Sequence, residues 1–148
     1  MAQGTTLSIP EAMAVVRKYI RRSEDRIAEL PGAWYGDTDH CPLRHSFGDH
    51  VYMREIFIPG GTVLTGKIHR QTHPYMLLQG ECLVVTEHEG MMHLCAPMTG
   101  ISPAGVKRFV YTLTDCWWIT VHYIEDNTQD LVVLESRIIS PGAEEKRS

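Results

Sequence analysis

Several common signatures are missing from this chain, and each absence argues against a class of function. The four cysteines occur singly, without a C-x-x-C pair, so neither a zinc ribbon nor a thioredoxin-like redox motif is indicated. There is no G-x-S-x-G, P-loop or dinucleotide-binding fingerprint, which argues against the common serine hydrolases and nucleotide enzymes. A helical zinc-protease motif is also absent, because Arg70 stands where that motif has glutamate and Pro74 follows closely. Any chemistry is therefore expected to be metal-centred.

Net charge and hydropathy limit the kinds of partner that this chain is expected to bind. The net charge is -4 and the lysines and arginines are scattered, which argues against nucleic acid as a partner. No apolar run approaches the roughly 20 residues needed to span a bilayer, so no membrane partner is expected. The first residues lack the basic start and apolar core of a signal peptide. We expect a cytoplasmic protein with reduced thiols.

The sequence after Ser8 predicts one amphipathic helix. Ser8 and Glu11 form a capping-box pattern around Pro10, which is favoured in a first helical turn. Apolar residues then recur at helical spacing up to Pro31, namely Met13, Val16, Ile20, Ile27 and Leu30. This stripe is expected to pack on the rest of the fold or on a second subunit.

The remainder reads as short strands separated by turns. A turn-rich stretch at 33–50 predicts a loop, and glycine and proline then punctuate predicted strands at 51–58, 63–73, 75–78, 82–87, 92–95, 100–102, 107–113 and 116–124. This spacing predicts an all-β barrel or sandwich. We divide the 148 residues into an N-terminal helix and wrapping loop at 1–50, a barrel at 51–135, and a C-terminal strand end and tail at 136–148.

Two histidines stand out within the predicted strand at 63–73. His69 and His73 are four residues apart, so on a strand they point to the same face, together with Lys67 and Gln71. In a curled sheet that face is the interior. A concave metal site lined by imidazoles is the first hypothesis.

The spacing around these histidines resembles the first motif of the cupin superfamily. Gly61, Lys67, His69, His73 and Gly80 have the separations of the motif glycine, two histidines, glutamate and closing glycine. In the same way the turn at 103–105 and the arginine that follows at 108 resemble the second motif, where proline and glycine precede a histidine. The resemblance implies a cupin-type jelly-roll β-barrel, here preceded by the predicted helix. In length and pattern the chain is similar to small single-domain cupins, many of them encoded by phages and bacteria.

Three positions depart from the cupin ligand pattern. Lys67 and Arg108 replace histidines and His73 replaces glutamate, so the usual metal site of three histidines and one glutamate does not carry over. His122 offers a third imidazole, because it shares one face of the predicted strand 116–124 with Thr120. His69, His73 and His122 would suit one divalent ion, Fe(II), Zn(II), Ni(II) or Cu(II). The alternative for His122 is a buried histidine bonded to a backbone carbonyl.

Lys67 and Arg108 form a second candidate group. If both occupy ligand positions of the motif, two cations project near the metal, and an unpaired buried cation requires an anionic partner. One reading is that they bind a small anionic substrate and take part in catalysis, with His45 closing the mouth of the site. The other is structural pairing with Glu55 or Glu81.

These residues give a leading function and two rivals. The leading hypothesis is a metal-dependent dioxygenase, isomerase or lyase acting on a small anionic organic molecule. The rivals are a ligand-binding or sensing module without turnover and a structural component of an assembly. The strand at 116–124 is apolar on both faces, and one face needs cover from the helix or from a partner chain. We therefore expect a homodimer.

Overall fold

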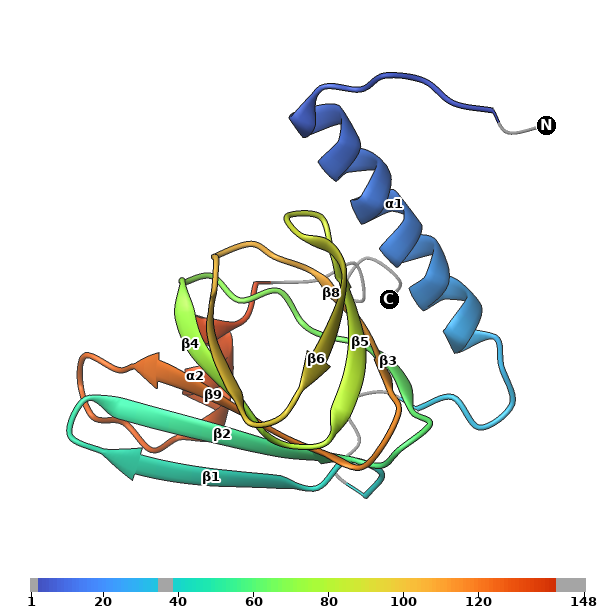
Figure 1. Cartoon of the computed structure of the whole chain (residues 1–148). Helices are drawn as coiled ribbons and strands as arrows, with labels where there is room; N and C mark the ends of the chain where they lie inside the picture. The colour runs from blue at the N-terminus through green and yellow to red at the C-terminus, as the bar shows by residue number, and fades with distance from the viewer. Residues whose placement is uncertain (1–2, 35–38, 141–148) are drawn as a thin grey trace.

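The computed structural model describes residues 3–34 and 39–140, which form two facing β-sheets and two helices (Figure 1). The elements in chain order are α1 (Ile9–Ala28), β1 (Leu43–Gly48), β2 (Val51–Ile58), β3 (Val63–Thr65), β4 (His73–Gln79), β5 (Glu81–Thr86), β6 (Gly90–Cys95), β7 (Met98–Ser102), β8 (Arg108–Thr112), β9 (Cys116–Tyr123) and α2 (Leu131–Ile138). The five-stranded sheet has the order β1-β2-β9-β4-β7, and the four-stranded sheet has the order β3-β8-β5-β6. All strand pairs within the two sheets are antiparallel.

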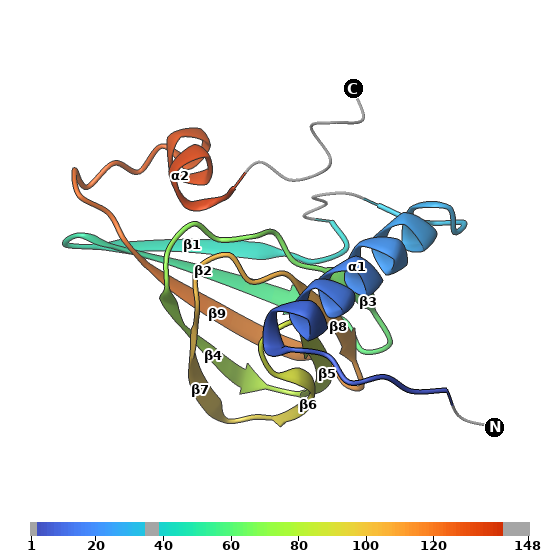
Figure 2. The same cartoon turned by 90° about the horizontal axis from the view of Figure 1, so that it is seen from above.

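Helix α1 begins where the capping box predicts. The Ser8 hydroxyl accepts from the Glu11 amide, and the Glu11 carboxylate accepts from the Ser8 amide. The helix lies across the outer face of the four-stranded sheet, over β3, β8 and β5 (Figure 2). Ile20 is fully buried there, and Lys107 pairs with Glu24 across the contact at 2.9 Å. Neither described helix combines the length and apolar character needed to cross a bilayer.

The prediction of one continuous strand at 63–73 is wrong, because the middle of this segment is not a strand. Strand β3 ends at Thr65, the next strand begins at His73, and the chain between them is a loop. Backbone hydrogen bonds hold this loop, from the Gly66 amide to the Arg108 carbonyl and from the Arg70 amide to the Ile138 carbonyl. His69 and His73 therefore do not share one strand.

Two other expectations near the ends of the chain also need correction. The stretch expected to be a loop up to residue 50 contains strand β1, which pairs with β2. The segment 136–148 was expected to hold a strand end and a tail, but helix α2 begins before it and includes its first three residues. Residues 141–148 lie outside the described part. The domain limits stay predictions. Leu134 of α2 packs on Tyr52 and Ile124, so this helix covers one end of the space between the sheets.

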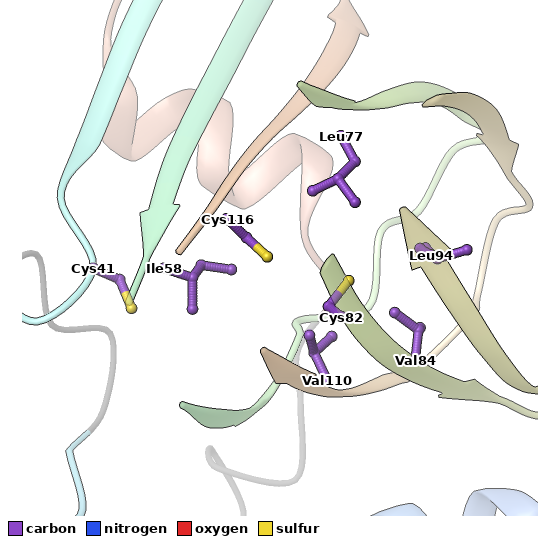
Figure 3. Packing of buried hydrophobic residues seen from close by; sticks show 8 residues of the cluster. All are labelled: Cys41, Ile58, Leu77, Cys82, Val84, Leu94, Val110 and Cys116. Atoms are coloured by element: carbon purple, nitrogen blue, oxygen red, sulfur yellow. The ribbon is translucent and has the colours of Figure 1, made fainter. Parts of the chain in front are cut away.

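The apolar core fills the opposite end of that space. Figure 3 shows side chains from both sheets converging there, with Leu77 from one sheet facing Val84 and Val110 from the other. The buried set is Cys41, Ile58, Leu77, Cys82, Val84, Leu94, Val110 and Cys116. Burial raises the pKa of the Cys82 thiol to about 12, so this cysteine is a packing group at neutral pH.

The inner face changes character along each strand. Because side chains on one face recur every second residue, β4 presents Leu77, Tyr75 and then His73 to the interior. Strand β9 runs the other way and presents Cys116, Trp118, Thr120 and His122. Tyr75 and Trp118 stack in the middle, with ring centroids 5.0 Å apart. One end of the interior is thus apolar, and the other carries imidazoles.

Candidate functional site

Strand pairing places His73 and His122 side by side. Tyr75 is opposite Thr120 in the pairing of β4 with β9, so the residues two positions further, His73 and His122, are also opposite one another. Both are buried, and their ring centroids are 4.8 Å apart. His122 therefore faces the interior, as the alternation in its strand predicts.

His69 reaches the same place from the loop between β3 and β4. Its carbonyl accepts a 2.9 Å hydrogen bond from the Gly105 amide, and its backbone bridges to Ile139 after helix α2. The His69 ring lies 4.2 Å from that of His73 and 5.1 Å from that of His122, measured between centroids. The three histidines proposed from sequence thus form one histidine cluster.

Hydrogen bonds orient two of the rings. His73 Nδ1 lies 3.0 Å from the Gln71 carbonyl, which can only accept, so Nδ1 carries the proton and Nε2 is left as a lone-pair donor. That Nε2 is 3.0 Å from His69 Nδ1. His122 Nε2 lies 3.0 Å from the Thr120 hydroxyl. The cluster therefore already aims one histidine lone pair at a neighbouring ring nitrogen.

The cluster is neutral at physiological pH. Burial, followed by the neighbouring His73 and His122, lowers the pKa of His69 to about 3. Burial and then His73 lower the pKa of His122 to about 4. Burial also lowers the pKa of His73, against the hydrogen bond to Gln71. Neutral imidazole is the form that binds metals, so protonation does not compete at pH 7.

Two guanidinium groups accompany the histidines. Arg108, on the inner face of β8, lies over the Tyr75 ring at 5.4 Å, and Arg54 is opposite Thr120 in the pairing of β2 with β9. Burial is the main cause that lowers the pKa of each arginine. The positive charge of both arginines in turn helps to lower the pKa of His69. Within the described part of the chain, neither arginine has an ion-pair partner within 4.0 Å.

His45 lies at the edge of this group. Its Nδ1 is 2.7 Å from the Tyr52 hydroxyl, and the Tyr52 ring in turn lies 5.9 Å from that of His122. Burial and then Arg54 lower the pKa of His45. The structure thus links His45 to the histidine cluster through one tyrosine.

Lys67 lies further out than its motif position implied. Its ammonium pairs with the carboxylate of Glu135 on α2, and both side chains are about half exposed. The two glutamates considered as partners for Lys67 and Arg108 are engaged elsewhere. Glu55 is bound by Arg44 on the outer face of the five-stranded sheet, and Glu81 pairs with His93.

Arg54 was not among the residues selected from sequence. The signal was available, because Tyr52, Arg54 and Ile56 alternate with Met53, Glu55 and Phe57 along one strand. An arginine on the same face as Tyr52 is unusual for an inner face and marks a place where charge is needed. What sequence could not supply was the pairing of that strand with the strand that carries His122.

A different group brings three donor atoms within 4.8 Å of one another. It consists of Glu81, His93 and Cys95, on strands β5 and β6. The three clustered histidines do not bring three nitrogens that close together, and no other group in the described residues does. A hollow of about 320 Å³ beside Trp117 and Phe57 touches neither group.

Solved structures share this architecture, whereas no protein-family model and no curated protein matches the sequence. Ectoine synthase from P. lautus superposes with a TM-score of 0.52 at 13% identity, covering 59% of this chain and 66% of that one. A cupin superfamily protein from Desulfitobacterium hafniense matches with a TM-score of 0.49 at 14% identity, over 66% of this chain and 93% of its own. A cupin-2 domain protein from Shewanella frigidimarina matches with a TM-score of 0.46 at 11% identity, over 69% and 92%.

The chain has the cupin fold. The expected jelly roll with a preceding helix is therefore confirmed, with the short helix α2 as an addition. In this chain, the histidines of the first motif-like segment lie at the imidazole-bearing end of the interior. At these identities the likeness establishes the fold alone.

Proposed function

We propose that this cupin binds one divalent transition metal through His69, His73 and His122 and acts there on a small anionic organic molecule. The observation that carries the proposal is the meeting of three neutral imidazoles, buried in His73 and His122 and partly buried in His69, with two arginines that have no ion-pair partner among the described residues. Fe(II), Zn(II), Ni(II) and Cu(II) all suit such a donor set.

The distances within the histidine cluster fit a metal ion. Two nitrogen ligands that are each about 2.1 Å from one ion, with an N–metal–N angle of about 90°, are about 3.0 Å apart. His69 Nδ1 and His73 Nε2 are separated by 3.0 Å. The third ligand requires His122 to turn from the Thr120 hydroxyl toward the other two rings. The Gln71 carbonyl holds His73 in the tautomer that binding needs, as outer-shell partners of ligating histidines commonly do.

The two arginines supply the anion site in this proposal. A guanidinium keeps its charge even when burial lowers its pKa, and its planar donors match a carboxylate or phosphate. Tyr75 holds Arg108 by its ring face, and Arg54 lies on the facing sheet, so the two approach a ligand from opposite sides. Lys67 is not included in this anion site because Glu135 already neutralises it.

Three histidine ligands leave positions open for substrate and for oxygen or water. A bound ion would supply oxygen activation or Lewis-acid chemistry for oxidation, isomerisation or lyase reactions. The chain's own residues would orient the anion through Arg54 and Arg108, and His45 with Tyr52 offers a hydrogen-bonded pair beside the cluster. The rival reading, a binding module without turnover, uses the same anion site.

Anion binding tests the proposal directly. We expect Arg54→Met and Arg108→Met each to weaken binding of oxalate or inorganic phosphate to the zinc-loaded protein about tenfold, because each removes a charged donor pair. Calorimetric titration measures the affinity. Arg22→Met, which removes an exposed guanidinium on α1, is the matched control and should leave the affinity unchanged. Equal affinities in all four proteins would refute the anion site.

We further propose that a second copy covers the outer face of the five-stranded sheet. Neither described helix packs on this face, because α1 lies on the other sheet and α2 packs on Tyr52. The face exposes Phe57, Ile101 and Tyr123, and its buried charge, Glu55, is neutralised in place by Arg44. An apolar face without net charge can meet its own copy about a two-fold axis.

The dimer prediction concerns Tyr123, which is 65% exposed at the end of β9. We expect Tyr123→Asp to weaken self-association at least about tenfold, because it places a charge in an apolar contact. Light scattering at micromolar concentration measures the mass. Val132→Asp changes a residue on α2 that is also well exposed, at 79%, and should leave the dimer intact. A wild-type monomer under these conditions would exclude the dimer.

A further inference from the structure

Three side chains of types that can ligate a metal converge on the outer face of the four-stranded sheet. Glu81 begins β5 and is directly opposite Cys95 at the end of β6, while His93 lies two residues before Cys95 on the same face. His93 Nε2 contacts the Glu81 carboxylate and is 3.8 Å from Cys95 Sγ. A carboxylate oxygen, an imidazole nitrogen and a thiol sulfur thus lie within 4.8 Å of one another.

The backbone holds these three residues in register. The Ala96 amide donates to the Gly80 carbonyl at 2.9 Å, which ties the residues flanking Glu81 and Cys95 together. The Leu113 amide donates to the Glu81 carbonyl at 2.8 Å, so β5 is also fixed from its other side. The donor set therefore rests on two paired strands rather than on loops.

This group is separate from the histidine cluster. Glu81, His93 and Cys95 point outward, whereas the alternate residues Cys82 and Leu94 point into the core between the sheets. The Glu81 and His93 side chains are about half exposed, and Cys95 is exposed, so an ion could enter directly from solvent. The other three cysteines of the chain are buried.

We propose that Glu81, His93 and Cys95 form a second metal site that takes Zn(II) or a similar borderline-soft ion. Zinc binds cysteine sulfur, histidine nitrogen and carboxylate oxygen in a tetrahedral arrangement, and three protein ligands leave the fourth position for water. Binding converts the Cys95 thiol to a thiolate, and its proton leaves to solvent. The ion replaces the direct contact between His93 and Glu81.

Protection of Cys95 from alkylation tests the site. With two equivalents of Zn(II) per chain, enough to fill both proposed sites, we expect iodoacetamide to modify Cys95 at least about tenfold more slowly, because a coordinated thiolate is a poorer nucleophile. Peptide mass analysis identifies the modified cysteine. His93→Ala and Glu81→Gln should abolish this protection. Co(II) should give a sulfur-to-metal absorption band in the wild-type protein and none in Cys95→Ser.

Variants of the histidine cluster distinguish the two metal sites. His69→Ala should keep the Co(II)-sulfur band and the protection of Cys95, whereas Cys95→Ser should keep any metal held by the histidines. Equal alkylation rates with and without zinc, or protection that survives His93→Ala, would overturn the surface site. Neither result would alter the proposal for the interior, since that site contains no cysteine.

Discussion

His73→Ala is expected to weaken binding of a divalent metal at the histidine cluster more than about 100-fold, since loss of a ligand exceeds the loss usually caused by an outer-shell change. Within the proposed site, His73 is the residue whose tautomer and position the structure fixes most completely. The Gln71 carbonyl fixes its Nδ1 proton, and its free Nε2 lies 3.0 Å from His69 Nδ1. Removing the ring takes away one of the two nitrogens already at ligand spacing.

The measurement is metal content per chain after purification without chelator, followed by competition titration with a zinc indicator. Both are best made in a Cys95→Ser background, so that the proposed surface site does not contribute. His88→Ala is the matched control, because it removes an exposed imidazole from the loop after β5. Thermal unfolding of each variant separates lost binding from lost folding.

Two outcomes would contradict the interior metal site. If the Cys95→Ser protein binds no divalent ion more tightly than about micromolar, the histidines serve as a buried hydrogen-bonded group. If it binds one ion and His73→Ala binds that ion equally well, the ligands lie elsewhere. In either case the arginine anion site remains testable by itself, and the binding-module reading becomes the stronger one.

Sequence periodicity predicted the two faces of β9 correctly. In β9 it assigned Thr120 and His122 to one face, and both are buried in the interior. It also showed that the opposite face, with Trp117 and Tyr123, is apolar. Alternation works here because β9 pairs on both sides, with β2 and β4, and has no freedom to twist out of register.

The approach of His69 to His73 was predicted for a reason that the structure does not support. The expected shared strand is a loop, and the two rings meet because that loop folds back over the start of β4. The loop is held by Ile138 and by the backbone at Gly105 and Arg108, all more than 30 residues away in sequence. Local pattern cannot anticipate such long-range hydrogen bonds.

The charged residues show where sequence reasoning ends. Lys67 has the position of a cupin ligand but pairs with Glu135 on a helix that the pattern did not predict. Arg54 has no counterpart in the motif. It is nevertheless opposite Thr120 in the pairing of β2 with β9, two residues along the strand from the pair formed by Tyr52 and His122. Which cation faces the histidines is decided by tertiary pairing, because lysine and arginine side chains are long enough to leave the face that their backbone suggests.

Gly80→Ala is expected to destabilise the fold by about 3 kcal/mol, because it combines a strained backbone with a backbone collision. Gly80, the closing glycine of the motif-like segment, has φ of +96°, in the left-handed region. An added Cβ would lie 2.3 Å from the Asp115 carbonyl oxygen and 2.8 Å from Cys116 Sγ. The carbonyl belongs to the turn before β9 and cannot move without disturbing the core at Cys116.

Thermal unfolding measures this loss as a fall in Tm of roughly 6 to 12 °C for a chain of this size. Gly90→Ala is the matched control, since Gly90 also has a positive φ, +66°, but an added Cβ there would meet no atom within 4 Å. It should show only the backbone strain, about 1 kcal/mol. The difference between the two variants isolates the crowding between the Gly80 turn and β9. Equal losses would show that the neighbouring turn yields to the methyl group, and that this glycine is required for its conformation alone.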